Sequence, residues 1–202
     1  MKPLNRRVLL RTAAATLALA AWPALAQEAG MSAEARRFIT DMIRDLTAID
    51  QKMKPGPERE RALDAQLSKY VALDRVGRFL LGASRAGATP EQLKEYDRLA
   101  PGFILADVRG EIAKLVAQSI AIDEVQLRSE RDALVRSRFR RKSGGLVRVD
   151  WRVIRQDDGL RLVDVYVNGV SRFVIRRDEF QAVVKAGGMP ALLKLLAAPP
   201  AA

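Results

Sequence analysis

The sequence predicts an α+β fold in which helices cover an antiparallel sheet. Apolar residues recur at helical spacing from about residue 32 to 119 and again from about 178 to 197. Between about 121 and 175 they alternate with polar residues instead, as in strands that bury one face. Helices grouped before and after a run of strands are typical of α+β proteins.

The first predicted helices are separated by short breaks. Ser32 is placed to cap a helix that continues to Met53, and the segment KPGPERE (54–60) interrupts it with two prolines and a glycine. Two further apolar stripes, over 63–71 and 73–80, follow at helical spacing. We therefore expect three helices in this part of the chain.

The later helices are marked by their start and stop signals. The segment TPE (89–91) supplies a capping hydroxyl, a proline for the first helical position and a carboxylate near the positive end of the helix dipole. We expect PG (101–102) to separate this helix from one over 103–116. Asp178 is placed to cap a C-terminal helix, which GG (187–188) ends ahead of a last short helix.

The middle of the chain is predicted to be an antiparallel meander. Glycine-containing turns at 143–145 and 157–159 join neighbouring strands. The Asn168-Gly169 step is either a tight hairpin turn or a glycine bulge. Strands are expected at 133–141, 146–155 and 160–168, with a weaker one near 122–128.

Strand alternation places two different sets of side chains on the two faces of this sheet. One face is basic and also carries Asp150, Asp164, Tyr166 and Asn168. The other face is apolar and has to be covered, which the helices can do. The basic residues are Arg136, Arg138, Arg140, Arg148 and Arg152, and the apolar residues are Val135, Phe139, Val147, Val149, Trp151, Val153, Val163, Val165 and Val167.

Each face has two interpretations that the residues alone leave open. The apolar face either packs into an ordinary core or forms one wall of a ligand cavity, because both need the same residue types. The arginine face is either a solvated surface or a docking surface for anionic headgroups or an acidic partner. Single-stranded nucleic acid requires aromatic side chains among the arginines, and only Tyr166 shares that face. We therefore expect no nucleic-acid partner.

The N-terminus predicts a signal peptide over residues 1–26, followed by one domain over 27–197 and a disordered tail over 198–202. The first eleven residues carry four positive charges, and the apolar stretch after them is too short to span a membrane. Ala24-Leu25-Ala26 supplies a cleavage pattern, and removal of the peptide lowers the formal charge from +11 to +7. The pair Arg6-Arg7 is typical both of an ordinary secretory signal and of a twin-arginine signal. We expect a periplasmic protein.

Catalysis finds little support in the composition. The chain has no histidine and no cysteine, so the commonest general base, the thiol nucleophile and most transition-metal ligands are missing. The adjacent Asp157 and Asp158 precede a glycine between two strands and are typical of a turn. A hydrolase that uses carboxylates ranks last, because no nucleophile–base pair can be named. We expect no enzyme, no catalytic residue, no metal and no cofactor.

Three segments together resemble the MlaC, or toluene-tolerance, family of periplasmic phospholipid-binding proteins. They are YVALDRVGRFLLG (70–82), ATPEQLKEYDRL (88–99) and VDWRVIRQDDGLRLVDVYVNGVSRFVIRRDEF (149–180). The chain departs from the family at 160–162, where the family usually has a tryptophan, and at 83–87, where it tends to carry an aromatic and basic segment. These departures bear on the lipid and on partner contacts more than on the fold.

The resemblance implies a twisted antiparallel sheet of the NTF2-like type, wrapped by helices, with an apolar lipid cavity between the sheet and the helices. It also implies a carrier that moves phospholipid between an outer-membrane lipoprotein–porin complex and an inner-membrane ABC transporter with its substrate-binding subunit. Such carriage maintains the lipid asymmetry of the outer membrane. A hopanoid-like lipid is an alternative cargo. A periplasmic adaptor with a filled core, which works through its arginine face, is the main alternative function.

Ten apolar residues are the candidates for the lining of this cavity. Their side chains suit an acyl chain because aliphatic and aromatic groups bury it without leaving polar atoms unpartnered. The candidates are Val149, Trp151, Val153, Val165, Val167 and Val170 from the sheet, with Phe79, Leu80, Phe103 and Ile104 from the helices. Arg136, Arg138, Arg140, Arg148 and Arg152 are the candidate surface for a headgroup or a protein partner.

Overall fold

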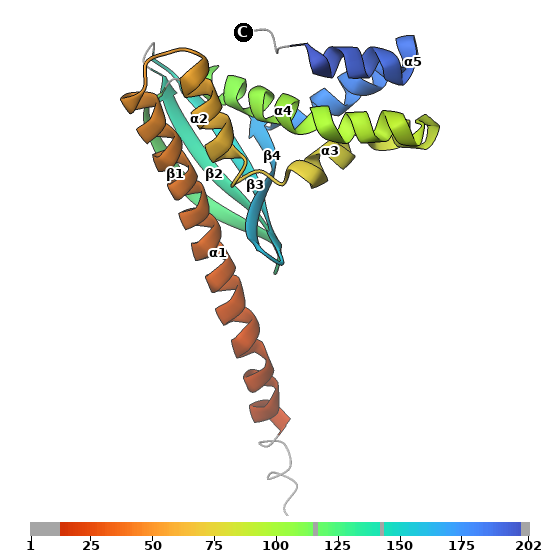
Figure 1. The fold of residues 1–202 in the computed structure, drawn as a ribbon. Coiled ribbons are helices and arrows are strands. Elements are labelled where there is room, and N and C mark those ends of the chain that lie inside the picture. Colours follow the sequence, from red (N-terminus) through yellow and green to blue (C-terminus); the bar gives the residue numbers. More distant parts are fainter. Residues whose placement is uncertain (1–12, 115–116, 142–143, 199–202) are drawn as a thin grey trace, which may run out of the picture.

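The structure confirms the α+β prediction. It is a computed structural model that describes residues 13–114, 117–141 and 144–198, so residues 1–12 of the predicted signal peptide and 199–202 of the predicted tail lie outside the description. Within these ranges, five α-helices and one short 3₁₀ helix accompany a five-stranded sheet whose strands follow chain order (Figure 1). The helices are α1 (Ala13–Lys52), α2 (Pro57–Leu67), α3 (Leu73–Leu81), η1 (Gly82–Gly87), α4 (Pro90–Lys114) and α5 (Arg172–Ala197).

Three helix boundaries differ from the prediction. Helix α1 runs through Ser32, which was expected to be its N-cap. Helix α4 continues through Pro101, because Tyr96, Ala100 and Ile104 form one buried stripe whose packing outweighs the hydrogen bond that a proline cannot make. Helix α5 begins before Asp178: Ser171 is its N-cap and accepts a hydrogen bond from the backbone N–H of Val174 (3.0 Å). The predicted break at 187–188 is confirmed: Gly188 has a non-helical backbone (φ 69°), and a second helical segment follows the kink.

The sheet is an antiparallel meander with one irregularity that the alternation pattern missed. Its strands are β1 (Ala117–Ser129), β2 (Asp132–Arg141), β3 (Leu146–Gln156), β4 (Gly159–Val167) and β5 (Val170–Ser171). The β3–β4 register shifts after the Arg152–Asp164 pair, so that Val153 faces Leu162. Because of this bulge, the prediction that Val163 lies on the apolar face is wrong. Leu162 takes that position and is fully buried in the core.

The Asn168-Gly169 step is a hairpin turn. Both residues have positive φ (50° and 85°), and Val167 pairs with Val170 directly across the turn. Two successive residues in the left-handed region are the signature of the turn that matches the twist of two antiparallel strands. The backbone N–H of Asn168 also donates to the carbonyl of Arg148 (2.8 Å), which fixes the turn against β3.

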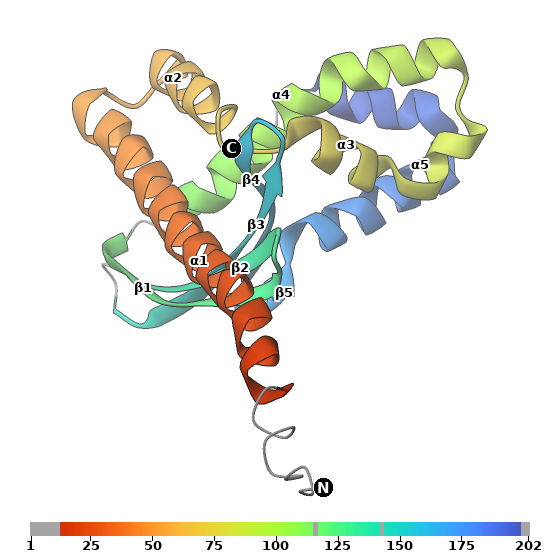
Figure 2. The ribbon, with the colours of Figure 1, turned by 90° about the horizontal axis from the view of Figure 1, so that it is seen from below.

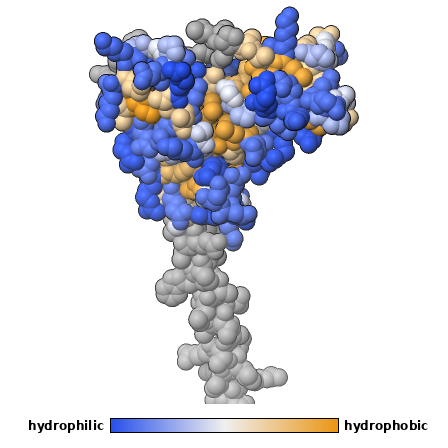
Figure 3. Space-filling model, viewed as in Figure 1, coloured by the Kyte–Doolittle hydropathy of each residue, from blue (hydrophilic) through white to orange (hydrophobic). Residues whose placement is uncertain are grey.

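The helices cover one face of the sheet in two groups. Helix α1 lies across β1 and β2 and buries Met31, Ala35, Ile39 and Met42, whereas α3, α4 and α5 lie together near β4 (Figure 2). Charged and polar residues cover most of the face in Figure 3, where apolar residues show between α2 and the second group. The core is therefore one continuous layer between the sheet and two separate sets of helices.

Candidate binding site

The structure places the ten candidate lining residues in two classes. Six are buried in the core between sheet and helices: Val149, Trp151, Val153, Val165, Leu80 and Ile104. Val167 and Phe103 are partly buried and pack against that core. Phe79 and Val170 are 40% and 52% exposed, so the structure does not bring them together with the others. A lipid-lining role stays a prediction for all ten.

Trp151 is the centre of the apolar face. Its strand neighbours are Val135 on β2 and Val165 on β4, and its ring centroid lies 6.1 Å from that of Phe139. Its indole Nε1 donates to the Oγ of Ser137 (2.9 Å), which in turn donates to the Val149 carbonyl (2.7 Å). The indole N–H of Trp151 therefore has a hydrogen-bond partner, as a buried tryptophan requires.

A hollow of about 10 Å³ lies between α4, β4 and α5. It is lined by Val108, Ile112, Val165 and Phe173, together with the charged residues Asp107, Glu111 and Arg172. A volume of this size holds about one water molecule. An acyl chain therefore enters this hollow only if the elements around it move apart.

The arginine face is closer to charge balance than alternation alone predicts. Arg138 on β2 binds Asp123 through two nitrogens (2.7 and 2.8 Å), and Arg136, also on β2, pairs with Glu124. Asp123 and Glu124 belong to β1. A bulge between Ile122 and Glu124 interrupts the alternation of this strand, so the sequence pattern did not place these two carboxylates on the arginine face.

Two further arginines on this face also have acidic partners. Arg152 pairs with Asp132 (2.7 Å) and Arg148 lies 3.4 Å from Asp150. Arg140 is exposed and has no ion pair within the described ranges. The surface carries alternating charges around a groove of about 460 Å³ that runs past Arg138 and Arg148.

Asp150 is a buried carboxylate on this face, and its replacement by asparagine is expected to stabilise the protein at pH 7 by about 1 kcal/mol. Its Oδ1 has no hydrogen-bond partner, and burial raises the pKa of the group above its ordinary 3.8. The charged form is therefore penalised once the pH rises past 3.8. Urea unfolding of Asp150→Asn and wild type at pH 7 and pH 3.5 measures this, and the gain should vanish at the lower pH.

Asp123→Asn serves as the control for this experiment. The hydrogen bond from Arg138 lowers the pKa of Asp123, so this change should lower stability at pH 7. Equal effects of the two substitutions would show that burial of Asp150 costs nothing.

A second buried carboxylate, Asp164, fixes the start of α5 on the sheet. Its Oδ2 accepts from the Ser171 hydroxyl (2.6 Å), and its Oδ1 accepts from the backbone N–H groups of Val165 (2.8 Å) and Phe173 (3.4 Å). Burial raises its pKa, and these hydrogen bonds oppose the rise. The first turn of α5 is thereby held to β4.

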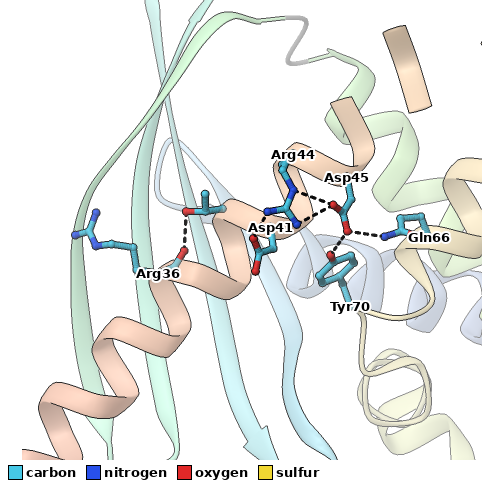
Figure 4. A network of polar contacts seen from close by, with 7 residues as sticks. Arg36, Asp41, Arg44, Asp45, Gln66 and Tyr70 are labelled. Carbon is cyan, nitrogen blue, oxygen red and sulfur yellow. Dashed lines mark hydrogen bonds and ion pairs between the residues drawn. The ribbon is translucent and has the colours of Figure 1, made fainter. Parts of the chain in front are cut away.

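The joint between α1 and α2 is held by a cluster of polar side chains. The carboxylate of Asp45 accepts hydrogen bonds from three side chains (Figure 4). The donors are the hydroxyl of Tyr70 (2.6 Å), the amide of Gln66 (2.8 Å) and the guanidinium of Arg44. The Tyr70 hydrogen bond is the main cause that lowers the pKa of Asp45, and burial raises that of Tyr70 to about 12. Tyr70 is therefore protonated at neutral pH and acts as a donor. The joint is structural.

The fold is that of an α+β protein with a meander sheet whose apolar face lies under helices. No group of three or more His, Cys, Asp or Glu residues able to hold a metal ion occurs in the described part of the chain. The sequence model of the MlaC protein family matches residues 36–198, and the chain belongs to this family. The resemblance of its motifs to that family is thus confirmed.

Comparison with solved structures gives a similar fold. The phospholipid-binding protein from Ralstonia solanacearum, solved in complex with a phospholipid, has a TM-score of 0.65 and 21% sequence identity. The match covers 81% of this chain and 94% of that one. No curated protein matches the chain.

Proposed function

We propose that this protein is a periplasmic carrier of phospholipid, without catalytic activity, whose cargo is held by its acyl chains between the sheet and the helices. The observation that carries the proposal is the match of nearly the whole domain to a phospholipid-bound fold, together with membership of the MlaC family. The carrier passes lipid between an outer-membrane lipoprotein–porin complex and an inner-membrane ABC transporter. It thereby maintains the lipid asymmetry of the outer membrane.

The physics of the buried face supports carriage. Each methylene gains roughly 0.8 kcal/mol on leaving water, so two acyl chains amount to something on the order of 20 kcal/mol. The inward face of the sheet is formed by Trp151, Phe139, Leu162 and valines, and the hydrogen bonds of its buried Ser137 are satisfied within the core. An acyl chain that replaces helix side chains on this face meets no unpartnered polar atom. The headgroup stays at the rim, in water.

The proposal predicts that the natively purified protein carries phospholipid in near-stoichiometric amount. Intact mass spectrometry followed by organic extraction measures this directly. Val167→Asp should empty the protein, because Val167 packs against the core and a buried carboxylate repels an acyl chain. Leu146→Asp is the control: Leu146 is 53% exposed at the start of β3 and is not a lining candidate, so lipid should be retained.

A folded wild-type protein that holds no lipid and takes none from vesicles would contradict the carrier function. The adaptor function would then remain, and reversal of the charge of Arg138 and Arg140 should abolish binding of its partner.

A further inference from the structure

Helices α4 and α5 meet along a ladder of three contacts, each one helical turn from the next. Phe103 contacts Phe180 edge-on with ring centroids 5.4 Å apart, and Asp107 pairs with Arg176. Glu111 pairs with Arg172 at 2.9 Å. We call these three contacts the α4–α5 seam.

The seam is mostly ionic and largely shielded from water. The side chains of Asp107 and Glu111 are each 13% exposed, and those of Arg172 and Arg176 are 28% and 25% exposed. The Nε atoms of both arginines are buried without a hydrogen-bond partner. The arginines thus remain incompletely satisfied while the seam is closed, and water would complete their bonding if it opened.

The closed apolar hollow lies directly beneath the seam. Its lining includes Asp107, Glu111 and Arg172 from the seam itself, with Val165 of β4 and Phe173 on the inner side. Separation of α4 from α5 would therefore lead from solvent to the apolar face of the sheet at β4.

The two sides of the seam are held by different parts of the molecule. The first turn of α5 is tied to β4 through Asp164, as described above. Helix α4 is tied to α3, because the Tyr96 hydroxyl donates to the Gly77 carbonyl (2.8 Å) and a Cβ at Gly77 would touch Ile104 and Tyr96. Helix α3 packs against both α4 and α5, so these two helices stay connected through α3 when the contacts of the seam separate.

We propose that the α4–α5 seam is the portal through which an acyl chain enters, and that the hollow lined by Val108, Ile112, Val165 and Phe173 is its first binding site. This inference rests on the carrier function proposed above. An opening here exposes the Phe103–Phe180 contact together with the charges of two ion pairs, which water solvates. Lifting α1 would expose Met31, Ile39 and Met42 to water and, within the described ranges, would release no charged pair from the core.

Cross-linking of the seam tests the portal. The chain contains no cysteine, so Asp107→Cys with Arg176→Cys introduces the only two thiols for a short, cleavable bis-thiol reagent. Uptake of fluorescent phospholipid from vesicles should fall at least about tenfold once the helices are linked, because closure of a gate blocks access. Reductant should restore it, which excludes misfolding as the cause.

A link across the joint between α1 and α2 is the control. Asp45→Cys with Gln66→Cys replaces a pair in direct contact and should leave uptake unchanged when linked by the same reagent. Undiminished uptake by the seam-linked protein, or equal loss in the control, would overturn the portal while leaving the carrier function intact. Absence of uptake by the wild type would overturn both.

Discussion

Replacement of Trp151 by alanine is expected to lower the free energy of unfolding by about 3–5 kcal/mol, the range for loss of a buried tryptophan. Trp151 is 1% exposed and touches strands on both sides and Phe139 on its own face. Its removal leaves a cavity at the centre of the sheet and withdraws the donor that Ser137 accepts from. Urea unfolding followed by circular dichroism measures the loss.

Trp151→Phe is the smaller change at this position. Phenylalanine keeps one six-membered ring and loses the Nε1 donor together with the rest of the five-membered ring, so we expect a cost of about 1–3 kcal/mol. A similar small cost for alanine would mean that neighbouring side chains collapse into the space, and that the core is less rigid than its burial indicates.

Asp164→Ala is expected to cost about 2–4 kcal/mol, since one change removes the acceptor of three hydrogen bonds at a buried position. The loss should be concentrated at the start of α5, because Ser171 and Phe173 lose their tie to β4. Hydrogen exchange of the amides of residues 172–180, together with urea unfolding, measures both effects.

Asp164→Asn is the matched control and should lie near the wild type at pH 7. An amide oxygen keeps the two backbone hydrogen bonds, and the neutral side chain avoids the burial that raises the pKa of Asp164. A raised pKa penalises the wild type as the pH rises above 3.8, so the asparagine variant should gain relative stability from pH 3.5 to 7. A large loss for asparagine would show that the charge itself holds the helix.

The periodicity of apolar residues predicts the fold class correctly. It assigns residues to the wrong face of the sheet where a one-residue bulge shifts the strand pattern. Alternation assigned Val149, Trp151 and Val165 to the buried face, and burial agrees with it. A single-residue bulge in β4 then exchanges Leu162 for Val163, and no local signal marks it. Helix α5 begins at Arg172 because Ser171 caps it, although Asp178 offered an equally good cap.

The charged contacts were less accessible to sequence reasoning than the core. Arg138 on β2 binds Asp123 on β1, and Arg176 binds Asp107, which lies 69 residues earlier in the chain on another helix. Such partners depend on register and on helix docking, which the pattern of one segment does not contain. Ser137 could have been recognised, because it is a polar residue at an apolar position of its strand.

The order of the strands has a consequence for how the chain folds. Each strand pairs with its neighbour in sequence, so every pairing closes a short loop and loses little chain entropy. The sheet can therefore form rapidly, one hairpin after another. Helix α1 must instead reach β1 and β2 across more than sixty residues of chain, between Lys52 and Ala117. Strand pairing therefore costs less chain entropy than the docking of α1, and we expect the hairpins of the sheet to form before α1 docks on them.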